Sequence, residues 1–246
     1  MSPDQGGKRL PAIADDSCER QRQPESESSG CEILLAGERL LLLPEKGVWW
    51  SAGETLFVAD LHWGKEAAFR AAAIPVPDGL EADLHRLSLL LARTNARRLV
   101  ILGDLQHHRS GKTPTGQALI QRWRKSVAGV EILLVRGNHD RSAGDPPAAW
   151  GIRTCAEPAT WGPWELWHHP PTHTPGLPAG LAGHLHPGFL LKRGPDRLRL
   201  SGYWLREELL ILPAFGGFTG QLPIQRAPRD EAFVIAADQV IRLAGR

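Results

Sequence analysis

The stretch TLFVADLH, residues 55–62, is a short apolar run that ends in Asp-Leu-His. The same arrangement recurs twice farther along the chain, where Leu99–Leu102 leads into Asp104 and Ile132–Val135 leads into Asn138. Short apolar runs that end in glycine or polar residues are typical of buried strands. The three runs therefore predict three strands, each followed by a polar side chain.

Helical patterns fill the two gaps between these runs. Pro77–Ala92 carries leucines at helical spacing, and Thr115–Val127 carries an apolar group of the same period. Strands that alternate with helices predict parallel βαβ units, so the central part of the chain is predicted to be a layered α/β structure.

Strand-like segments also lie on both sides of this alternating region. They are Ile33–Leu43, Val48–Trp50, Glu165–Trp167, Arg197–Leu205, Glu208–Leu212 and Ala232–Leu243. The last three belong to the C-terminal third and are separated by turns. We expect them to form a second, mixed sheet that packs against the first.

Length and composition set the domain organisation. Residues 1–30 are polar with almost no apolar periodicity, so we predict a disordered tail. The remaining residues, 31–246, are enough for one well-buried domain. The formal net charge of +2 neither requires nor opposes a polyanionic partner.

The sequence also bears on location. No stretch approaches the roughly 18 apolar residues of a membrane span, and the N-terminus lacks the basic start and apolar run of a secretory signal. Cys18, Cys31 and Cys155 are odd in number and far apart, so we interpret them as free thiols in a reducing compartment. We therefore expect no membrane association and a cytoplasmic location.

Carboxylates, an amide and imidazoles follow the ends of the strand-like runs. The set is Asp60, His62, Asp104, Asn138, His139, His168, His184 and His186. Open α/β sheets bind ligands outside the carboxyl ends of their strands, so these distant segments should converge. Oxygen and imidazole donors suit Mn, Fe and Zn. The set is too large for one tetrahedral ion and fits two ions roughly 3.5–4 Å apart, bridged by a carboxylate.

Four motifs resemble those of the calcineurin-like metallophosphoesterase superfamily in order and spacing. They are Asp60-x-His62, Gly103-Asp104, Gly137-Asn138-His139-Asp140 and Gly183-His184-x-His186. The resemblance implies a four-layer α/β/β/α sandwich of two packed mixed sheets that hydrolyses phosphate esters. It further implies that Asp60, His62 and His186 hold a first metal, that Asp104 bridges, and that Asn138, His168 and His184 complete the second.

The same resemblance assigns roles beside the metals. His139 is implied to contact the phosphate and to protonate the leaving oxygen. Asp140 is implied to orient the His139 imidazole.

A narrower resemblance is to the bacterial ligase-associated DNA-damage-response endonucleases. It rests on Val58–Lys65, Ile74–Pro77, His168–Pro171, Gly183–Pro187 and Leu212–Gly220. It implies a DNA substrate and functional association with an ATP-dependent DNA ligase and a helicase. The implied cofactors are two divalent cations, Mn²⁺ foremost, with Fe, Zn or Mg as alternatives.

Two ligand assignments have alternatives. Asp60 would instead cap a following helix if Lys65–Ala72 is helical. Strand alternation sends adjacent side chains in opposite directions, so only one of His168 and His169 should bind metal. We prefer His168, because superfamily members with His-x-Pro after the strand use the first histidine, and we place His169 in the wall of the pocket.

Further side chains are candidates for substrate contact. Arg136 lies beside the Asn-His-Asp turn and would bind a phosphate of the backbone, although an ordinary solvated charge explains it equally well. Trp63 would stack on a base. His107, three residues after Asp104, would contact phosphate or serve only the structure.

The function predicted from the sequence is that of a dinuclear-metal phosphodiesterase or nuclease, acting on DNA during end processing or repair. The alternative is a small-molecule phosphodiesterase or phosphatase that uses the same two-metal site. A binding module without activity is disfavoured, because no ligand expected from the motifs is missing.

Overall fold

The computed structural model describes residues 30–245 except 72, 74, 75, 77, 78 and 173–175. The predicted tail, residues 1–30, therefore lies almost entirely outside the described residues. A single domain over residues 31–246 stays a prediction.

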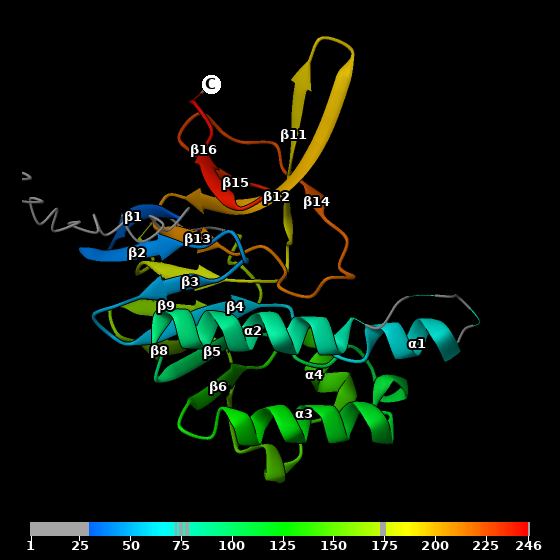
Figure 1. Ribbon diagram of the computed structural model, residues 1–246. Helices are drawn as coiled ribbons and strands as arrows, with labels where there is room; N and C mark the ends of the chain where they lie inside the picture. Colours follow the sequence, from blue (N-terminus) through cyan, green and yellow to red (C-terminus); the bar gives the residue numbers. More distant parts are fainter. Residues whose placement is uncertain (1–29, 72, 74–75, 77–78, 173–175, 246) are drawn as a thin grey trace, which may run out of the picture.

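The first sheet has seven strands in sequence order (Figure 1). They are β1 (Cys31–Leu35), β2 (Glu38–Leu42), β3 (Val48–Trp50), β4 (Thr55–Ala59), β5 (Arg98–Leu102), β6 (Glu131–Val135) and β7 (Ile152–Cys155). The strands β1 to β4 are antiparallel neighbours, and β4 to β7 are parallel. The three apolar runs are thus confirmed as parallel strands β4, β5 and β6.

One predicted strand was wrong. Ile33–Leu43 is two strands, because the chain reverses at Ala36 and Gly37, which have φ of 52° and 79°. A two-residue hairpin turn of type I′ has positive φ at both central residues, and glycine adopts it readily. The apolar residues on both sides of the turn concealed it in the sequence.

The second sheet contains the C-terminal strands together with β8 to β10, which precede them. Its members are β8 (Ala159–Trp161), β9 (Trp164–Trp167), β10 (Gly180–Ala182), β11 (Pro187–Arg193), β12 (Asp196–Arg206), β13 (Leu209–Ile211), β14 (Leu222–Pro223), β15 (Glu231–Ala236) and β16 (Gln239–Arg242). Strands β9, β10 and β13 are parallel, whereas β11, β12 and β15 pair antiparallel. The predicted second, mixed sheet is confirmed.

All described helices precede β7. They are α1 (Lys65–Ala71), α2 (Leu80–Thr94), α3 (Pro114–Ser126) and α4 (Asn138–Ala143), with 3₁₀ turns η1 (Arg109–Gly111) and η2 (Ala148–Trp150). The α/β class with two mixed sheets is confirmed. Within the described residues, however, the second sheet has no helices of its own, so the four-layer description lacks its second helical layer there. None of the described helices is long and apolar enough to cross a membrane.

Strand alternation divides the core into two layers. Leu56 and Val58 of β4 face α2 and α3 in one apolar cluster, whereas Phe57 and Ala59 face the second sheet in another. All five residues of β4 are therefore buried, which explains its continuous apolar sequence.

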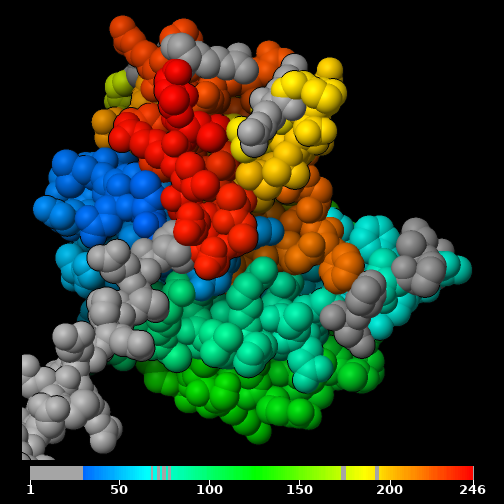
Figure 2. All heavy atoms as spheres, turned by 45° about the horizontal axis from the view of Figure 1, so that its top comes forward, coloured from blue at the N-terminus to red at the C-terminus, as the bar shows by residue number. Residues whose placement is uncertain are grey.

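The two sheets are joined by hydrogen bonds at the carboxyl end of β4. The Phe215 amide donates to the Ala59 carbonyl at 2.8 Å, and Ala59 forms an isolated parallel bridge with Ala214. The C-terminal residues (red in Figure 2) also lie against the N-terminal strands (blue), where β16 contacts β1. The Leu212 amide donates to the Ala182 carbonyl at 2.8 Å, so the segment that contacts the end of β4 also contacts the end of β10, and the two carboxyl ends lie in one region.

Candidate active site

The predicted metal ligands follow strands of both sheets. Asp60 and His62 follow β4, Asp104 follows β5, and Asn138 begins α4 after β6. From the second sheet, His168 follows β9, and His184 and His186 follow β10. Their ligand atoms come close together, in overlapping groups that each lie within 4.8 Å: Asp60, His62 and His186; Asp60, Asp104 and His168; His168, His169 and His184.

The backbone at these positions is strained. Twelve non-glycine residues of the described chain have positive φ, and five of them are predicted ligands: Asp60, His62, Asp104, His184 and His186. Such conformations cost roughly 1–3 kcal/mol each and persist only where the surrounding structure enforces them. The clustering of strain at one place indicates a functional site.

Two glycines let the ligand segments approach one another. A Cβ on Gly103 would lie 1.9 Å from Nδ1 of His168, and a Cβ on Gly137 would lie 2.2 Å from Oδ1 of Asp104. Neither space admits any other residue. The glycines of the predicted motifs are therefore required by close packing between segments.

Asp104 lies between the two predicted groups of ligands. Its Oδ2 is 3.9 Å from Nε2 of His62, and its Oδ1 is 3.5 Å from Nε2 of His168. Asp60 connects the same region to the second sheet, because its Oδ2 accepts a hydrogen bond from the His184 amide at 2.8 Å and lies 3.5 Å from Nε2 of His186. Asp60 is thus held within the site and does not cap α1.

His168 is fully buried at the centre of the second group. Its Nδ1 contacts the Leu102 carbonyl at 3.2 Å, so the proton belongs on Nδ1 and Nε2 carries the lone pair. Nε2 lies 2.9 Å from Oδ1 of Asn138 and 3.1 Å from Nδ1 of His184. An imidazole whose Nδ1 is fixed by a backbone carbonyl is typical of metal ligands.

Several buried ligand atoms have no hydrogen-bond partner among the described residues. They are Oδ1 of Asp60, Nδ1 and Nε2 of His62, and Nε2 of His186. His186 is oriented by Nδ1, which contacts the Gly220 carbonyl at 3.2 Å. Unpartnered buried polar atoms are rare in native proteins and call for an explanation. A divalent cation would take up the lone pairs of Oδ1 of Asp60, of one ring nitrogen of His62 and of Nε2 of His186, so the residues present fit a metal.

Burial of these side chains favours the same interpretation. Burial, aided by the neighbouring His186 imidazole, lowers the pKa of His62 to about 2, and burial lowers that of His168 to about 4. Both imidazoles are therefore neutral at pH 7 and able to donate a lone pair. Burial and the neighbouring Asp60 carboxylate raise the pKa of Asp104 to about 8. A bound cation would reverse that shift and keep Asp104 ionised.

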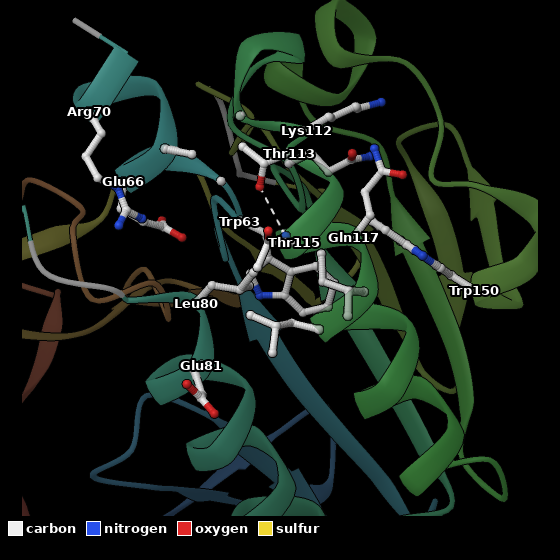
Figure 3. Close-up of a pocket in the computed structure, with 17 residues that line it drawn as sticks. Trp63, Glu66, Arg70, Leu80, Glu81, Lys112, Thr113, Thr115, Gln117 and Trp150 are labelled. Carbon is white, nitrogen blue, oxygen red and sulfur yellow. Dashed lines mark hydrogen bonds between the residues drawn. The ribbon is translucent and has the colours of Figure 1, made fainter. Parts of the chain in front are cut away.

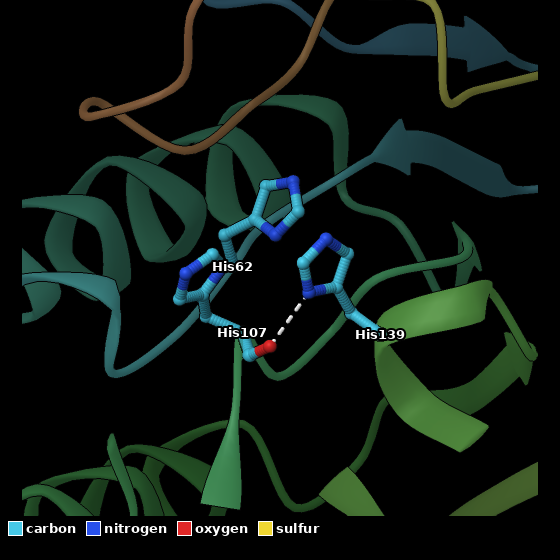
Figure 4. A group of neighbouring side chains, drawn as sticks. All are labelled: His62, His107 and His139. Carbon is cyan, nitrogen blue, oxygen red and sulfur yellow. Dashed lines mark hydrogen bonds between the residues drawn. The ribbon is translucent and has the colours of Figure 1, made fainter. Parts of the chain in front are cut away.

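Figure 4 shows His62, His107 and His139 grouped at one side of this set. The His139 ring stacks on His107 with centroids 4.8 Å apart and meets His62 edge-on at 5.0 Å. Nδ1 of His139 lies 2.7 Å from the His107 carbonyl, and its Nε2 is 3.9 Å from Oδ2 of Asp104. The carbonyl thus fixes the ring with Nε2 directed at the candidate metal centre.

The role predicted for Asp140 was wrong. Its carboxylate accepts hydrogen bonds from the amides of Gly137 at 3.0 Å and Gln106 at 3.2 Å. It therefore stabilises the first turn of α4 and joins that turn to the segment after β5. The His107 carbonyl, and not Asp140, orients the His139 imidazole.

The predicted base-stacking role of Trp63 was also wrong. Its side chain faces away from the site and packs edge-on against Trp123 and Trp150, leaving it 3% exposed. Trp63 instead lines a separate pocket of about 360 Å³ between α1, α3 and the start of α2 (Figure 3). The sequence could not distinguish these roles, because a tryptophan next to a ligand is compatible with either side of the chain.

The side chains of the basic residues near the site form ion pairs or hydrogen bonds with other residues of the protein. The Arg136 guanidinium makes a two-pronged ion pair with Asp145 at 2.6 and 2.8 Å and also contacts Thr154, which does not support the predicted phosphate contact. Arg109 donates to the Ser142 carbonyl, and Lys112 donates to the Ala143 carbonyl.

One residue of the site escaped the sequence analysis. Glu157 lies between β7 and β8, where the chain passes from the first sheet to the second. Its Oε2 accepts the amides of His168 and His169, both at 2.8 Å, while Oε1 contacts Nδ1 of His169 at 2.7 Å and Arg141 at 3.1 Å. His169 is thus held beside His168 and His184, with both ring centroids 4.5 Å away.

A fold of two mixed sheets with this set of carboxylates and imidazoles at their shared edge defines a class of hydrolase. Residues 54–188 match the family model of the calcineurin-like phosphoesterases, and the chain belongs to that family. It is therefore a metal-dependent phosphoesterase.

The chain is also similar to two solved structures. The nuclease MPE of Pseudomonas putida is 39% identical, with a TM-score of 0.76, over 87% of this chain and 100% of that chain. This neighbour fits the resemblance noted for the narrower set of motifs. YfcE, a phosphoesterase from E. coli, is 17% identical with a TM-score of 0.39, over 78% of this chain and 99% of that one. No curated protein matches the chain.

Proposed function

We propose that this protein is a dinuclear-metal phosphodiesterase that cleaves DNA. The observation that carries the proposal is the convergence of seven predicted ligands from both sheets, several with buried atoms that lack a partner among the described residues. The similarity to a protein described as a nuclease supports a nucleic-acid substrate.

The chain offers two sets of ligands joined by one carboxylate. Asp60, His62 and His186 would hold the first ion, and Asn138, His168 and His184 the second. Asp104 would bridge them, since its two oxygens lie 3.9 Å from His62 Nε2 and 3.5 Å from His168 Nε2. Two divalent cations would supply positive charge that polarises the phosphoryl group and activates the attacking water. Mn²⁺ is the proposed ion, with Fe, Zn or Mg as alternatives.

His139 is suited to protonate the leaving oxygen. Its Nδ1 contacts the His107 carbonyl at 2.7 Å, so Nε2 faces the candidate metal centre and is the atom that would transfer the proton. The side chain is 34% exposed, which allows it to exchange protons with water. A general acid placed in this way contributes roughly 10²–10⁴-fold to a rate.

The biological setting proposed is DNA end processing or repair in the cytoplasm, in association with an ATP-dependent DNA ligase and a helicase. This step rests on the resemblance of Val58–Lys65, Gly183–Pro187 and Leu212–Gly220 to the ligase-associated endonucleases. Genes for such a ligase and helicase beside the gene of this protein would support it.

The experiment measures cleavage of single-stranded and end-bearing DNA with Mn²⁺ by the wild type, Asp104→Ala and His139→Ala. We expect the wild type to cleave DNA and both variants to lose that activity. DNA cleavage by both variants at the wild-type rate contradicts the proposal. A parallel screen uses bis-p-nitrophenyl phosphate, mononucleotides and cyclic nucleotides. Efficient turnover of one of the nucleotides without action on DNA would instead identify a small-molecule phosphodiesterase.

A further inference from the structure

The hairpin formed by β11 and β12 begins at the candidate metal centre. Strand β11 starts at Pro187, directly after His186, and pairs with β12 from Gly188 opposite Ser201 to Arg193 opposite Asp196. The base of the hairpin is tied to the site, because the Leu222 amide donates to the His186 carbonyl at 3.0 Å. From there the hairpin projects beyond both sheets (Figure 1).

One face of the hairpin points toward the side of the first sheet. Tyr203 of β12 is buried between the sheets, where its hydroxyl donates to the carbonyls of Leu43 and Gly47. Side chains alternate along a strand, so Arg199 and Arg197 lie on the same strand face as Tyr203. Asp60 and Asp104 also lie on that side, because they follow strands of the first sheet.

The Arg199 side chain extends over the base of the hairpin. Its Cδ lies 3.4 Å from the position that a Cβ on Gly188 would occupy, two residues beyond His186. A glycine at this position thus leaves room for the arginine stem. We define the hairpin face as Gly188, Leu190, Arg197 and Arg199, which share one side of the two strands.

The arginines of the hairpin face differ from those at the rim of the site in their ion pairing. Arg136 and Arg141 at the rim form ion pairs with Asp145 and Glu157. Arg197 and Arg199 are exposed, and neither guanidinium forms an ion pair or a hydrogen bond with another residue in the described part of the chain. A guanidinium without an internal partner retains its donors for a phosphate, which it binds in a two-pronged geometry.

We infer that the hairpin face is a binding surface for the sugar-phosphate backbone of the nucleic-acid strand that is cut at the metal centre. The inference rests on the proposed action on DNA. Arg197 pairs with Lys192, and Lys192 is six residues after His186. Six residues of strand span about 20 Å, so Arg197 lies about that far from His186 along the hairpin. At about 3.4 Å per stacked nucleotide, the arginines contact phosphates up to roughly six nucleotides from the cut. Short substrates therefore do not reach them.

The test compares the double variant Arg197→Ala/Arg199→Ala with a matched control, Arg122→Ala/Lys125→Ala. The control residues are also exposed, but they lie on α3, on the opposite side of the molecule in Figure 1. For each protein with Mn²⁺, kcat/KM is measured on bis-p-nitrophenyl phosphate, a 3-nucleotide strand and a 20-nucleotide strand, across a series of NaCl concentrations.

We expect the hairpin variant to lose roughly tenfold in kcat/KM on the 20-nucleotide strand and to reduce its salt dependence by about 1.4 in log–log slope. Its activity on the two small substrates should stay within twofold of the wild type, as should all activities of the control.

Equal losses on the 20-nucleotide strand and on bis-p-nitrophenyl phosphate, or in both double variants, would overturn the inference. A wild type that cleaves DNA together with an unaffected hairpin variant would overturn only the inference. A wild type without action on DNA would overturn the proposed function as well.

Discussion

A cluster of predicted metal ligands and a pocket lie on opposite sides of the chain segment that follows β4. On one side, His62 faces Asp104 and His186 in a dense group of ligand atoms. On the other side, Trp63 lines the pocket of about 360 Å³ between the helices (Figure 3). Adjacent residues of one segment thus serve two regions of different chemistry.

The difference shows that a pocket by itself does not locate the chemistry. The pocket between the helices has a largely apolar floor that includes Leu80, Ile120 and Trp150. Among its lining residues, the buried side-chain atom without a partner in the described chain is the Trp63 indole nitrogen, a donor that cannot bind metal. The metal side contains several unpartnered acceptor atoms together with backbone strain. These two features, not cavity size, mark the site.

The comparison predicts that the largest effect comes from the residue shared by both groups of ligands. Asp104→Asn keeps the shape of the side chain but removes the charge that would bridge two cations. We expect loss of metal from both positions and a fall in activity of about 10³-fold or more, because metal charge contributes several kcal/mol. Metal content by mass spectrometry and hydrolysis of bis-p-nitrophenyl phosphate provide the measurements. A variant that retains two metals per chain would show that Asp104 does not bridge.

His139→Ala separates proton transfer from metal binding on the same side. The imidazole contacts the Asp104 carboxylate only at 3.9 Å, and the His139 amide, which the variant keeps, donates to Oδ1 of Asp104 at 2.9 Å. We expect unchanged metal content and a kcat lower by roughly 10²–10⁴-fold. His85→Ala, an exposed histidine on α2, is the control and should match the wild type. Metal loss equal to that of Asp104→Asn would refute the assigned role.

The sequence predicted that the carboxylates and imidazoles of this cluster come together, because the signals for it are local. The strands β4, β5 and β6 are largely apolar runs, and a predicted ligand follows each within three residues, as Asp60 follows β4. The partners of Asp140, Arg136 and Trp63 could not be predicted in the same way. Their contacts come from segments distant in the chain or from the opposite side of the sheet, and the sequence pattern around them is the same for either role.

Glu157 illustrates the limit most clearly. It has no motif, and its position at the crossing between sheets brings it to His168 and His169 only in the folded chain. Because its carboxylate accepts two amides and also joins α4 through Arg141, we interpret it as a positioning residue for the second group of ligands.

Glu157→Gln should therefore weaken metal binding without removing any ligand. The side-chain NH₂ of the glutamine would point at groups that already donate to Glu157, namely backbone amides or the Arg141 guanidinium. One of these N–H groups would then lack an acceptor. We expect the affinity for Mn²⁺ at one of the two positions to fall by 10–100-fold, measured by titration calorimetry. Glu131→Gln, whose carboxylate forms an exposed ion pair with Arg153, is the matched control. Equal affinities in both variants would show that Glu157 serves only the fold.

The smallest effect is expected on the other side of the comparison, in the pocket between the helices. Thr115 and Gln117 line that pocket, are exposed, and lie on α3 away from every predicted ligand. Thr115→Ala and Gln117→Ala should change kcat/KM on bis-p-nitrophenyl phosphate by less than about twofold, in keeping with surface substitutions that remove no named interaction. Because Trp63 joins the pocket to His62 through the backbone, a loss of tenfold or more with unchanged thermal stability would mean that the two regions act as one. The separation of the pocket from the metal-ligand cluster would then have to be abandoned.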